Sequence, residues 1–224
     1  MALTKFNFNS FDLTTSAGSG LGFNSSANAL SAIGAGAMTH IKTLTASGDS
    51  TLSFVDGSSS VVLDNTYPVY LFKFINVHPS ADQSAFQFNA SVDSGSNYNS
   101  QVNSTFFYLY HRGSDAHNFF GYDTGRDLAN NTHYQSITFN ANVDNYSSGN
   151  GFIYLFNPSS TTFATHFLTV SNEDSQTSGE QGLSQQVFTG GYFNTTSAVD
   201  AIQFKYSSGN IDAGTIKLYG IKDS

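Results

Sequence analysis

Cysteine and tryptophan are absent from this chain of 224 residues, and proline occurs only 3 times. Without cysteine the chain forms no disulfide, no thiolate metal site and no cysteine nucleophile. The scarcity of proline excludes a proline-rich fibre or linker. No apolar run approaches the roughly 18 residues of a membrane-spanning helix. A chain of this length nevertheless buries enough surface to fold without cross-links.

Positive charge is also scarce, because 8 lysine and arginine residues stand against 16 aspartate and glutamate residues, for a net charge of −8. Nucleic acids and anionic membranes are bound by clustered lysine and arginine, so the composition argues against both classes of partner. The N-terminal segment MALTKFNFNSFDL lacks the apolar core of a signal peptide. We therefore expect no export by the general secretory route.

Short apolar segments recur along the chain, separated by turns of Gly, Ser, Asn and Asp. Apolar side chains alternate with polar ones in these segments, as in strands with one buried face. The segment AFQFNASV, for example, places four side chains on one face: Phe86, Phe88, Ala90 and Val92. The segments follow one another about every eight to twelve residues, the spacing of a sandwich or barrel. The sequence thus predicts an all-β fold, an antiparallel β-sandwich of jelly-roll or lectin-like type, over residues 37–224.

Two inner segments carry more specific predictions. The segment TFFYLYH, residues 105–111, is bulky on both faces, which favours a central strand. The segment GRDLANNTHYQS, residues 125–136, is expected to form a turn or one short helix.

The C-terminal segments AIQFKY and GTIKLYGI are predicted to form a closing β-hairpin. The connection is SSGNIDAG, residues 207–214. Period-two alternation buries Ile216 and Leu218, and each contributes about 1.5–3 kcal/mol when it leaves water.

Residues 1–36 differ from the rest and are predicted to be an extended N-terminal arm. Phe6, Phe8 and Phe11 alternate with polar residues, and Leu13 precedes a flexible Ser- and Gly-rich stretch. We expect these four apolar side chains to contact a capsid or other partner. A frayed terminus is the alternative.

The C-terminal stretch SSGNIDAGTIKLYGIK resembles the ends of structural proteins of tailed phages, especially marine phages that infect cyanobacteria and related bacteria. The shared features are an aromatic strand, SSGN, a small turn and an LYG(I/L)K finish. The resemblance extends to residues 55–79, 91–99 and 155–167 and to the opening MALTKFNFNSFDL. It covers most of the chain past residue 40.

This resemblance implies a virion component built on a jelly-roll or lectin-like β-sandwich. Our first hypothesis is a decoration (cement) protein on the capsid surface. It would be a homo-oligomer, a dimer or trimer, that contacts the major capsid protein or other virion proteins. The alternative is a tail or fibre component that binds host surface glycans.

Motifs for chemistry are weak in this sequence. His111, Asp115 and His117 could ligate a metal, but a polar loop at a strand end is the favoured interpretation. Asp123 and Asp127 lie around Gly125, where turn aspartates are ordinary. No GxSxG elbow and no phosphate-binding loop occur. We therefore expect no enzyme, no catalytic residue, no metal and no cofactor, with a β-sandwich hydrolase as a third, weaker hypothesis.

Tyrosine is the residue type that suits sugar stacking in a chain without tryptophan. Six tyrosines are candidates for glycan stacking or for an interface: Tyr98, Tyr108, Tyr110, Tyr122, Tyr134 and Tyr146. Packing in the core or at an interface is the favoured alternative for them.

Overall fold

The computed structural model describes residues 20–23, 30–33, 36–115, 117–174 and 182–222. The chain divides into two units, Met1–Thr39 and His40–Ser224, each of which is described by itself. In the first unit, β1 (Gly20–Phe23) pairs antiparallel with β2 (Leu30–Ile33). The boundary expected at residues 36 and 37 stays a prediction.

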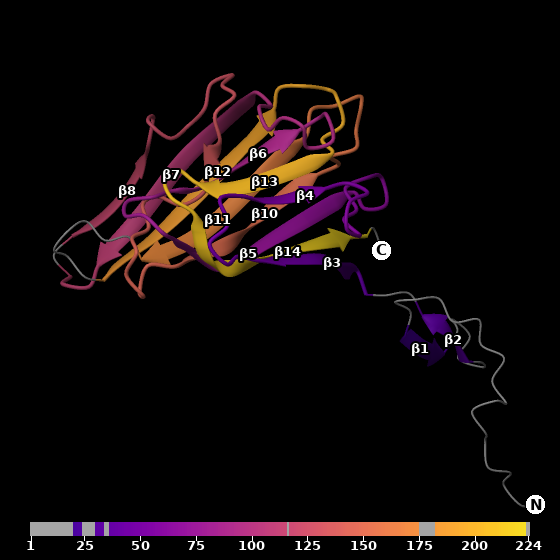
Figure 1. The fold of residues 1–224 in the computed structure, drawn as a ribbon, viewed down its shortest axis with the longest axis horizontal. Coiled ribbons are helices and arrows are strands. Elements are labelled where there is room, and N and C mark those ends of the chain that lie inside the picture. The colour runs from indigo at the N-terminus through magenta and orange to yellow at the C-terminus, as the bar shows by residue number, and fades with distance from the viewer. Residues whose placement is uncertain (1–19, 24–29, 34–35, 116, 175–181, 223–224) are drawn as a thin grey trace, which may run out of the picture. The chain divides into compact units, whose positions relative to one another are not determined.

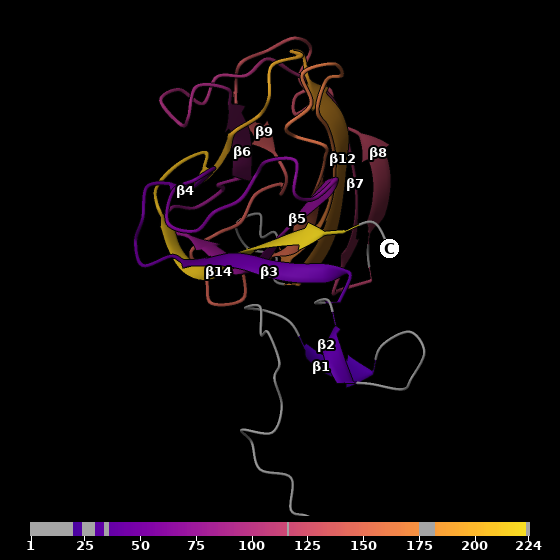
Figure 2. The same cartoon turned by 90° about the vertical axis from the view of Figure 1, so that its right-hand side faces the viewer.

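Two antiparallel sheets make up the second unit (Figure 1). The large sheet has eight strands in this spatial order: β3 (Met38–Thr45), β14 (Ile211–Ile221), β5 (Val69–Pro79), β10 (Gly149–Phe156), β11 (His166–Asp174), β12 (Leu183–Phe193), β7 (Val102–Arg112) and β8 (Asn118–Tyr122). The small sheet has four: β4 (Leu52–Val55), β13 (Ala201–Tyr206), β6 (Phe86–Ser91) and β9 (Gln135–Ser136). The small sheet faces the large sheet across the interior (Figure 2), with β4 packing on β5 and β6 on β11 and β12.

Phenylalanines from both sheets fill the space between them. Phe54 and Phe204 of the small sheet pack on Phe72 of the large sheet, with ring centroids 5.3 and 5.6 Å apart. Phe88 meets Phe167 edge-to-face at 5.0 Å. Such contacts add about 0.5–1.5 kcal/mol each beyond the area they bury. The predicted all-β sandwich is confirmed, and its core is where the period-two pattern places it.

Aspartate side chains hold several of the turns that connect the strands. Asp56 accepts a hydrogen bond from the Leu63 N–H at 2.8 Å, and Asp64 accepts one from the Thr66 N–H at 2.7 Å. Asp93 accepts hydrogen bonds from the N–H and side-chain amide of Asn97. These three acids therefore serve the turns, a common role of aspartate.

The predicted closing β-hairpin is wrong. The strand β13 belongs to the small sheet and β14 to the large sheet, so residues 207–210 cross between the layers. The Ser207 N–H donates to the Ala85 carbonyl, and the Ile211 N–H donates to the Asp49 carbonyl. Alternation fixes which side chains are buried, but it does not fix which strand lies alongside. The buried residues themselves, Ile216 and Leu218, are confirmed.

Three smaller expectations have different outcomes. The strand β7 pairs with both β12 and β8, so it is an interior strand as expected, next to the edge strand β8. Val92 is 42% exposed, because β6 ends at Ser91 and the Asp93 turn follows. The expectation of a turn or one short helix at residues 125–136 is confirmed in its first form, since the described residues of this segment contain turns and β9.

Two glycines in β14 explain part of the C-terminal pattern. Gly214 has φ of +114° at a register shift between β14 and β5, and a Cβ there would lie 2.6 Å from Val77 Cα. Gly220 lies under the ring of Tyr67, where a Cβ would lie 2.3 Å from a ring carbon. A side chain is therefore excluded at both positions, by backbone strain at Gly214 and by an aromatic ring at Gly220.

Candidate functional site

The predicted contact residues fall in different parts of the molecule. Phe6, Phe8, Phe11 and Leu13 lie outside the described residues, so their role as arm contacts stays a prediction. The candidate tyrosines do not gather at one site.

Tyr108 and Tyr110 lie on the inward side of β7, where they belong to a row of packed rings. The Tyr108 ring lies 4.7 Å from Phe139 and 5.2 Å from Phe119, measured between centroids. The Tyr110 ring stacks on Phe119 at 5.7 Å. These are packing contacts, and both tyrosines are half-buried.

Tyr122 and Tyr146 are more exposed than the tyrosines of this row. Tyr122 lies on the edge strand β8, opposite Phe107, and donates a hydrogen bond of 2.6 Å to Asp127. Tyr146 lies between β9 and β10 with its ring largely in solvent. Neither residue lines the pocket described next.

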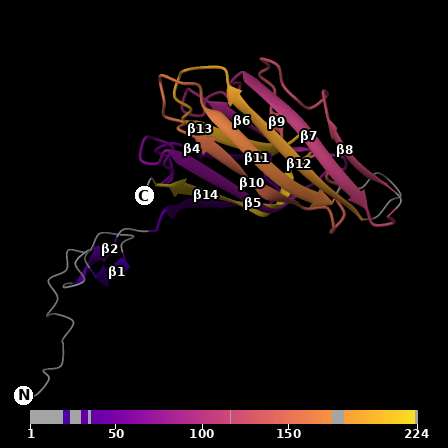
Figure 3. The same ribbon diagram turned by 180° about the vertical axis from the view of Figure 1, so that it is seen from behind.

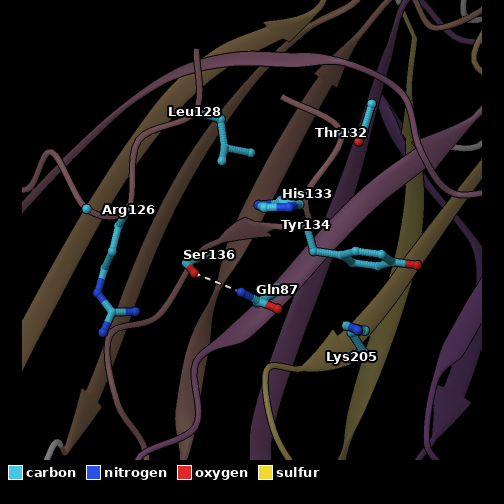
Figure 4. Close-up of a pocket in the computed structure, with 9 residues that line it drawn as sticks. Gln87, Arg126, Leu128, Thr132, His133, Tyr134, Ser136 and Lys205 are labelled. Carbon is cyan, nitrogen blue, oxygen red and sulfur yellow. Dashed lines mark hydrogen bonds between the residues drawn. The ribbon is translucent and has the colours of Figure 1, made fainter. Parts of the chain in front are cut away.

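A polar pocket of about 480 Å³ opens over the small sheet (Figure 4). Its walls come from β6, β9, β13 and the segment between β8 and β9. The side chains with polar groups at this pocket are Gln87, Arg126, Thr132, His133, Tyr134, Ser136 and Lys205. No aspartate or glutamate is among the described residues that line it. The volume is within the range of small-ligand sites.

Hydrogen bonds fix the segment that forms one wall of the polar pocket. The buried Asn89 of β6 donates to the carbonyls of Thr132 and His133 at 3.0 and 3.1 Å. Gln135 donates to the Arg126 carbonyl at 3.1 Å. The wall is thus held to the small sheet at several points, so the pocket exists before any ligand arrives.

Tyr134 is the aromatic group of the polar pocket. Its hydroxyl donates to the side-chain carbonyl of Gln203, whose amide donates in turn to Ser53 at 2.9 Å. The Lys205 ammonium lies 4.7 Å from the centre of the Tyr134 ring, within cation–π distance. Burial raises the pKa of Tyr134 to about 12, and the nearby Tyr98 adds to that increase. Tyr134 is therefore a neutral hydrogen-bonding ring at ordinary pH.

The two permanent cations of the pocket differ in what neutralises them. Arg126 lies 3.5 Å from Asp123, donates to Asn140 at 2.9 Å and stacks on Phe139 at 4.1 Å. Burial lowers the pKa of Arg126 and Asp123 opposes this change, but a guanidinium stays charged. Within the described part of the chain, no carboxylate lies within ion-pair distance of Lys205. Lys205 is therefore the uncompensated charge at this site.

The outer face of the large sheet is a second candidate surface (Figure 3). Directly opposed residues form one row across it, in this order: Lys217, Lys73, Phe152, Val170, Phe188, Phe107 and Tyr122. Phe188 and Phe107 stack at 5.2 Å, and Phe120 next to them is 70% exposed. We call this surface the apolar face. No described element of the sandwich unit covers it.

Of the described side chains among the predicted metal candidates, His111 and Asp115 contact each other. His111 Nε2 lies 3.0 Å from Asp115 Oδ1 at an exposed turn, and the carbonyl of His117 accepts the Arg112 N–H. The described residues hold no group of three or more His, Cys, Asp or Glu side chains that could surround a metal ion. Asp123 accepts the Gly125 N–H at 2.8 Å, so it serves a turn as expected.

The sequence did not point to Gln87, Arg126 or Lys205, because they come from three distant segments. The available signal is the scarcity of cations, since two of only 8 lysine and arginine residues line one pocket.

No helix in the described ranges is long and apolar enough to cross a membrane. Comparisons with protein-family models, curated proteins and solved structures find no match to this chain.

Proposed function

We propose that the chain is a structural protein of a tailed-phage virion that decorates the capsid surface, attached through the apolar face. The observation that carries this proposal is the exposure of large side chains on that face. Leu168 is 54% exposed and Phe120 70%, and Leu168 lies on β11, whose other side is buried at Phe167 and Thr169. Exposed apolar surface of this extent marks a contact with another protein. The C-terminal resemblance to phage structural proteins supports the virion as the place of that contact.

The lysines on the same sheet indicate the chemistry of the partner. Lys73 and Lys217 stand directly opposite each other on β5 and β14, and neither pairs with a carboxylate of the described residues. Like charges in this position destabilise a sheet by about 0.2–1 kcal/mol. A capsid protein with apolar side chains and nearby carboxylates would neutralise both lysines. The N-terminal arm, with Phe6, Phe8 and Phe11, remains the proposed second contact.

Reattachment of the purified chain to virions that lack it tests the proposal. A Leu168→Glu substitution places a charge in the middle of the apolar face, so we expect capsid occupancy to fall at least tenfold. Phe163→Glu is the matched control, because Phe163 is 74% exposed in the loop before β11, outside that face. Loss of occupancy by both variants alike, or by neither, would contradict attachment through the apolar face.

The polar pocket favours a second candidate function, a tail or fibre component that binds host surface glycans. Tyr134, Gln87 and Ser136 offer a ring, an amide and a hydroxyl at one place. Copy number separates the two candidates. A count near that of the major capsid protein indicates decoration, and a far smaller count indicates the tail.

A further inference from the structure

The outer surfaces of the two sheets have opposite characters. The outer side of the small sheet carries polar and amide side chains such as Ser53, Gln87 and Gln203, and the polar pocket lies there. The apolar face lies on the far side of the sandwich (Figures 1 and 3). A chain attached through the apolar face therefore presents the pocket to solvent.

The groups around the pocket match a saccharide more closely than a simple anion. Gln87 donates to the Ser136 hydroxyl at 3.1 Å, which leaves its carbonyl oxygen free to accept from a ligand (Figure 4). Thr132 and Ser136 add hydroxyls, and Leu128 and Tyr134 add apolar surface. A sugar ring offers hydroxyls and an apolar C–H face to such a mixture.

The charge of the pocket adds a preference for acidic ligands. Lys205, Arg126 and His133 line it without a lining carboxylate among the described residues. Asp123 already compensates Arg126, so Lys205 has the charge that a ligand can use. An ammonium makes charge-assisted hydrogen bonds to carboxylate and sulfate oxygens, which are about twice as strong as neutral ones.

We propose that the polar pocket binds acidic saccharides, with Lys205 contacting a carboxylate or sulfate group and Tyr134 and Gln87 contacting the sugar. This inference deepens the second candidate function and rests on it in one respect, that the ligand is a glycan. It does not depend on attachment to a capsid, because the purified chain alone contains every residue involved. The acid can come from a uronic acid or from a sulfate ester, and the experiment separates these sources.

The test measures binding of the purified full-length chain to three oligosaccharides of equal length. They are an oligogalacturonate, a sulfated oligosaccharide and a neutral dextran oligomer. We expect at least one acidic oligomer to bind tenfold or more tightly than the neutral one. The acidic oligomer that binds identifies carboxylate or sulfate as the preferred group. Tighter binding of an aspartate-rich peptide than of either acidic oligomer would overturn the proposal.

Variants then assign the binding to the pocket. Lys205→Gln keeps a polar side chain, one atom shorter, but removes its charge, so the acidic preference should fall about tenfold. Lys205→Arg should restore it. The matched control Lys217→Gln removes a charge from the apolar face and should leave binding unchanged. Thermal unfolding of each variant shows that the fold is retained.

Two results would overturn the inference in different ways. Equal binding of neutral and acidic oligomers, or equal effects of Lys205→Gln and Lys217→Gln, refutes the acidic site but leaves glycan binding in place. No binding of any saccharide, on these probes and on a broad glycan array, refutes both the inference and the second candidate function. Neither result affects the reattachment assay.

Discussion

Glu173 is the most deeply buried acid of the described residues, and it makes the stability of the sandwich depend on pH. Its side chain lies on the inner face of β11 and is 1% exposed. One carboxyl oxygen accepts hydrogen bonds from the N–H groups of Phe139 and Asn140, the second at 3.0 Å. The other oxygen finds no partner among the described residues, and neither does the side-chain oxygen of Gln185, which lies directly opposite on β12. A proton on the unpartnered Glu173 oxygen would make it a donor, and the Gln185 oxygen could accept that hydrogen bond.

The size of the effect follows from the pKa of Glu173. Burial raises it from 4.5 to about 7, although the hydrogen bonds from Phe139, Thr138 and Asn140 and the charge of Arg126 act in the opposite direction. Below pH 4.5 the carboxyl is protonated in both the folded and the unfolded chain, so stability is unaffected. Between pH 4.5 and about 7 the carboxyl ionises in the unfolded chain only, so the unfolding free energy falls across this window, and the loss is complete once the folded carboxyl also ionises. At 1.36 kcal/mol per pKa unit, the full loss of unfolding free energy is about 3 kcal/mol.

The perturbation is Glu173→Gln, which keeps the accepting oxygen and cannot ionise. We expect the wild-type unfolding free energy, measured by urea titration from pH 4 to pH 9, to decline relative to the variant by about 3 kcal/mol. A direct check is available because the chain contains only two glutamates, Glu173 and Glu180, so a ¹³Cδ-glutamate spectrum holds two signals. One signal should titrate near pH 7 and be missing from the variant. Parallel stability curves for the two proteins across this range would refute the reasoning.

Two further predictions concern the turn at Asp93 and the closing strand. Hydrogen bonds from Ser91 and Asn97 lower the pKa of Asp93 from 3.8 to about 2. The ionised carboxylate therefore stabilises the wild type above pH 3.8, and this stability is lost as the pH falls through about 2. Asp93→Asn should remove this contribution. Acid unfolding followed by circular dichroism measures this difference, and coincident acid transitions would count against it. Gly220→Ala should destabilise the fold by about 1–3 kcal/mol, because the added methyl overlaps the Tyr67 ring. Gly36→Ala is the control in the same chemical denaturation assay, since no atom lies within 4 Å of a Cβ built there.

The sequence predicts the core better than the topology, and the physical reason is the range of each signal. Burial of Phe86, Phe88 and Phe204 follows from period-two alternation, which is local. The neighbour of each strand depends on how distant segments pair, and the error at β13 and β14 is of this kind. The polar pocket joins Gln87, Arg126 and Lys205 only after the sheet has formed. Local sequence contains no signal for such a juxtaposition.

A sandwich with two unlike outer surfaces has a preferred orientation on any partner. Burial of Leu168 and Phe120 in an interface removes apolar surface from water, whereas burial of Lys205 and the amides of the small sheet would cost desolvation without a specific ligand. The apolar face is therefore the side that protein contact favours, and the polar pocket is the side that remains in solvent. The same orientation is expected at a capsid site and at a tail site. The proposed protein contact and the proposed saccharide site therefore lie on different surfaces and do not compete.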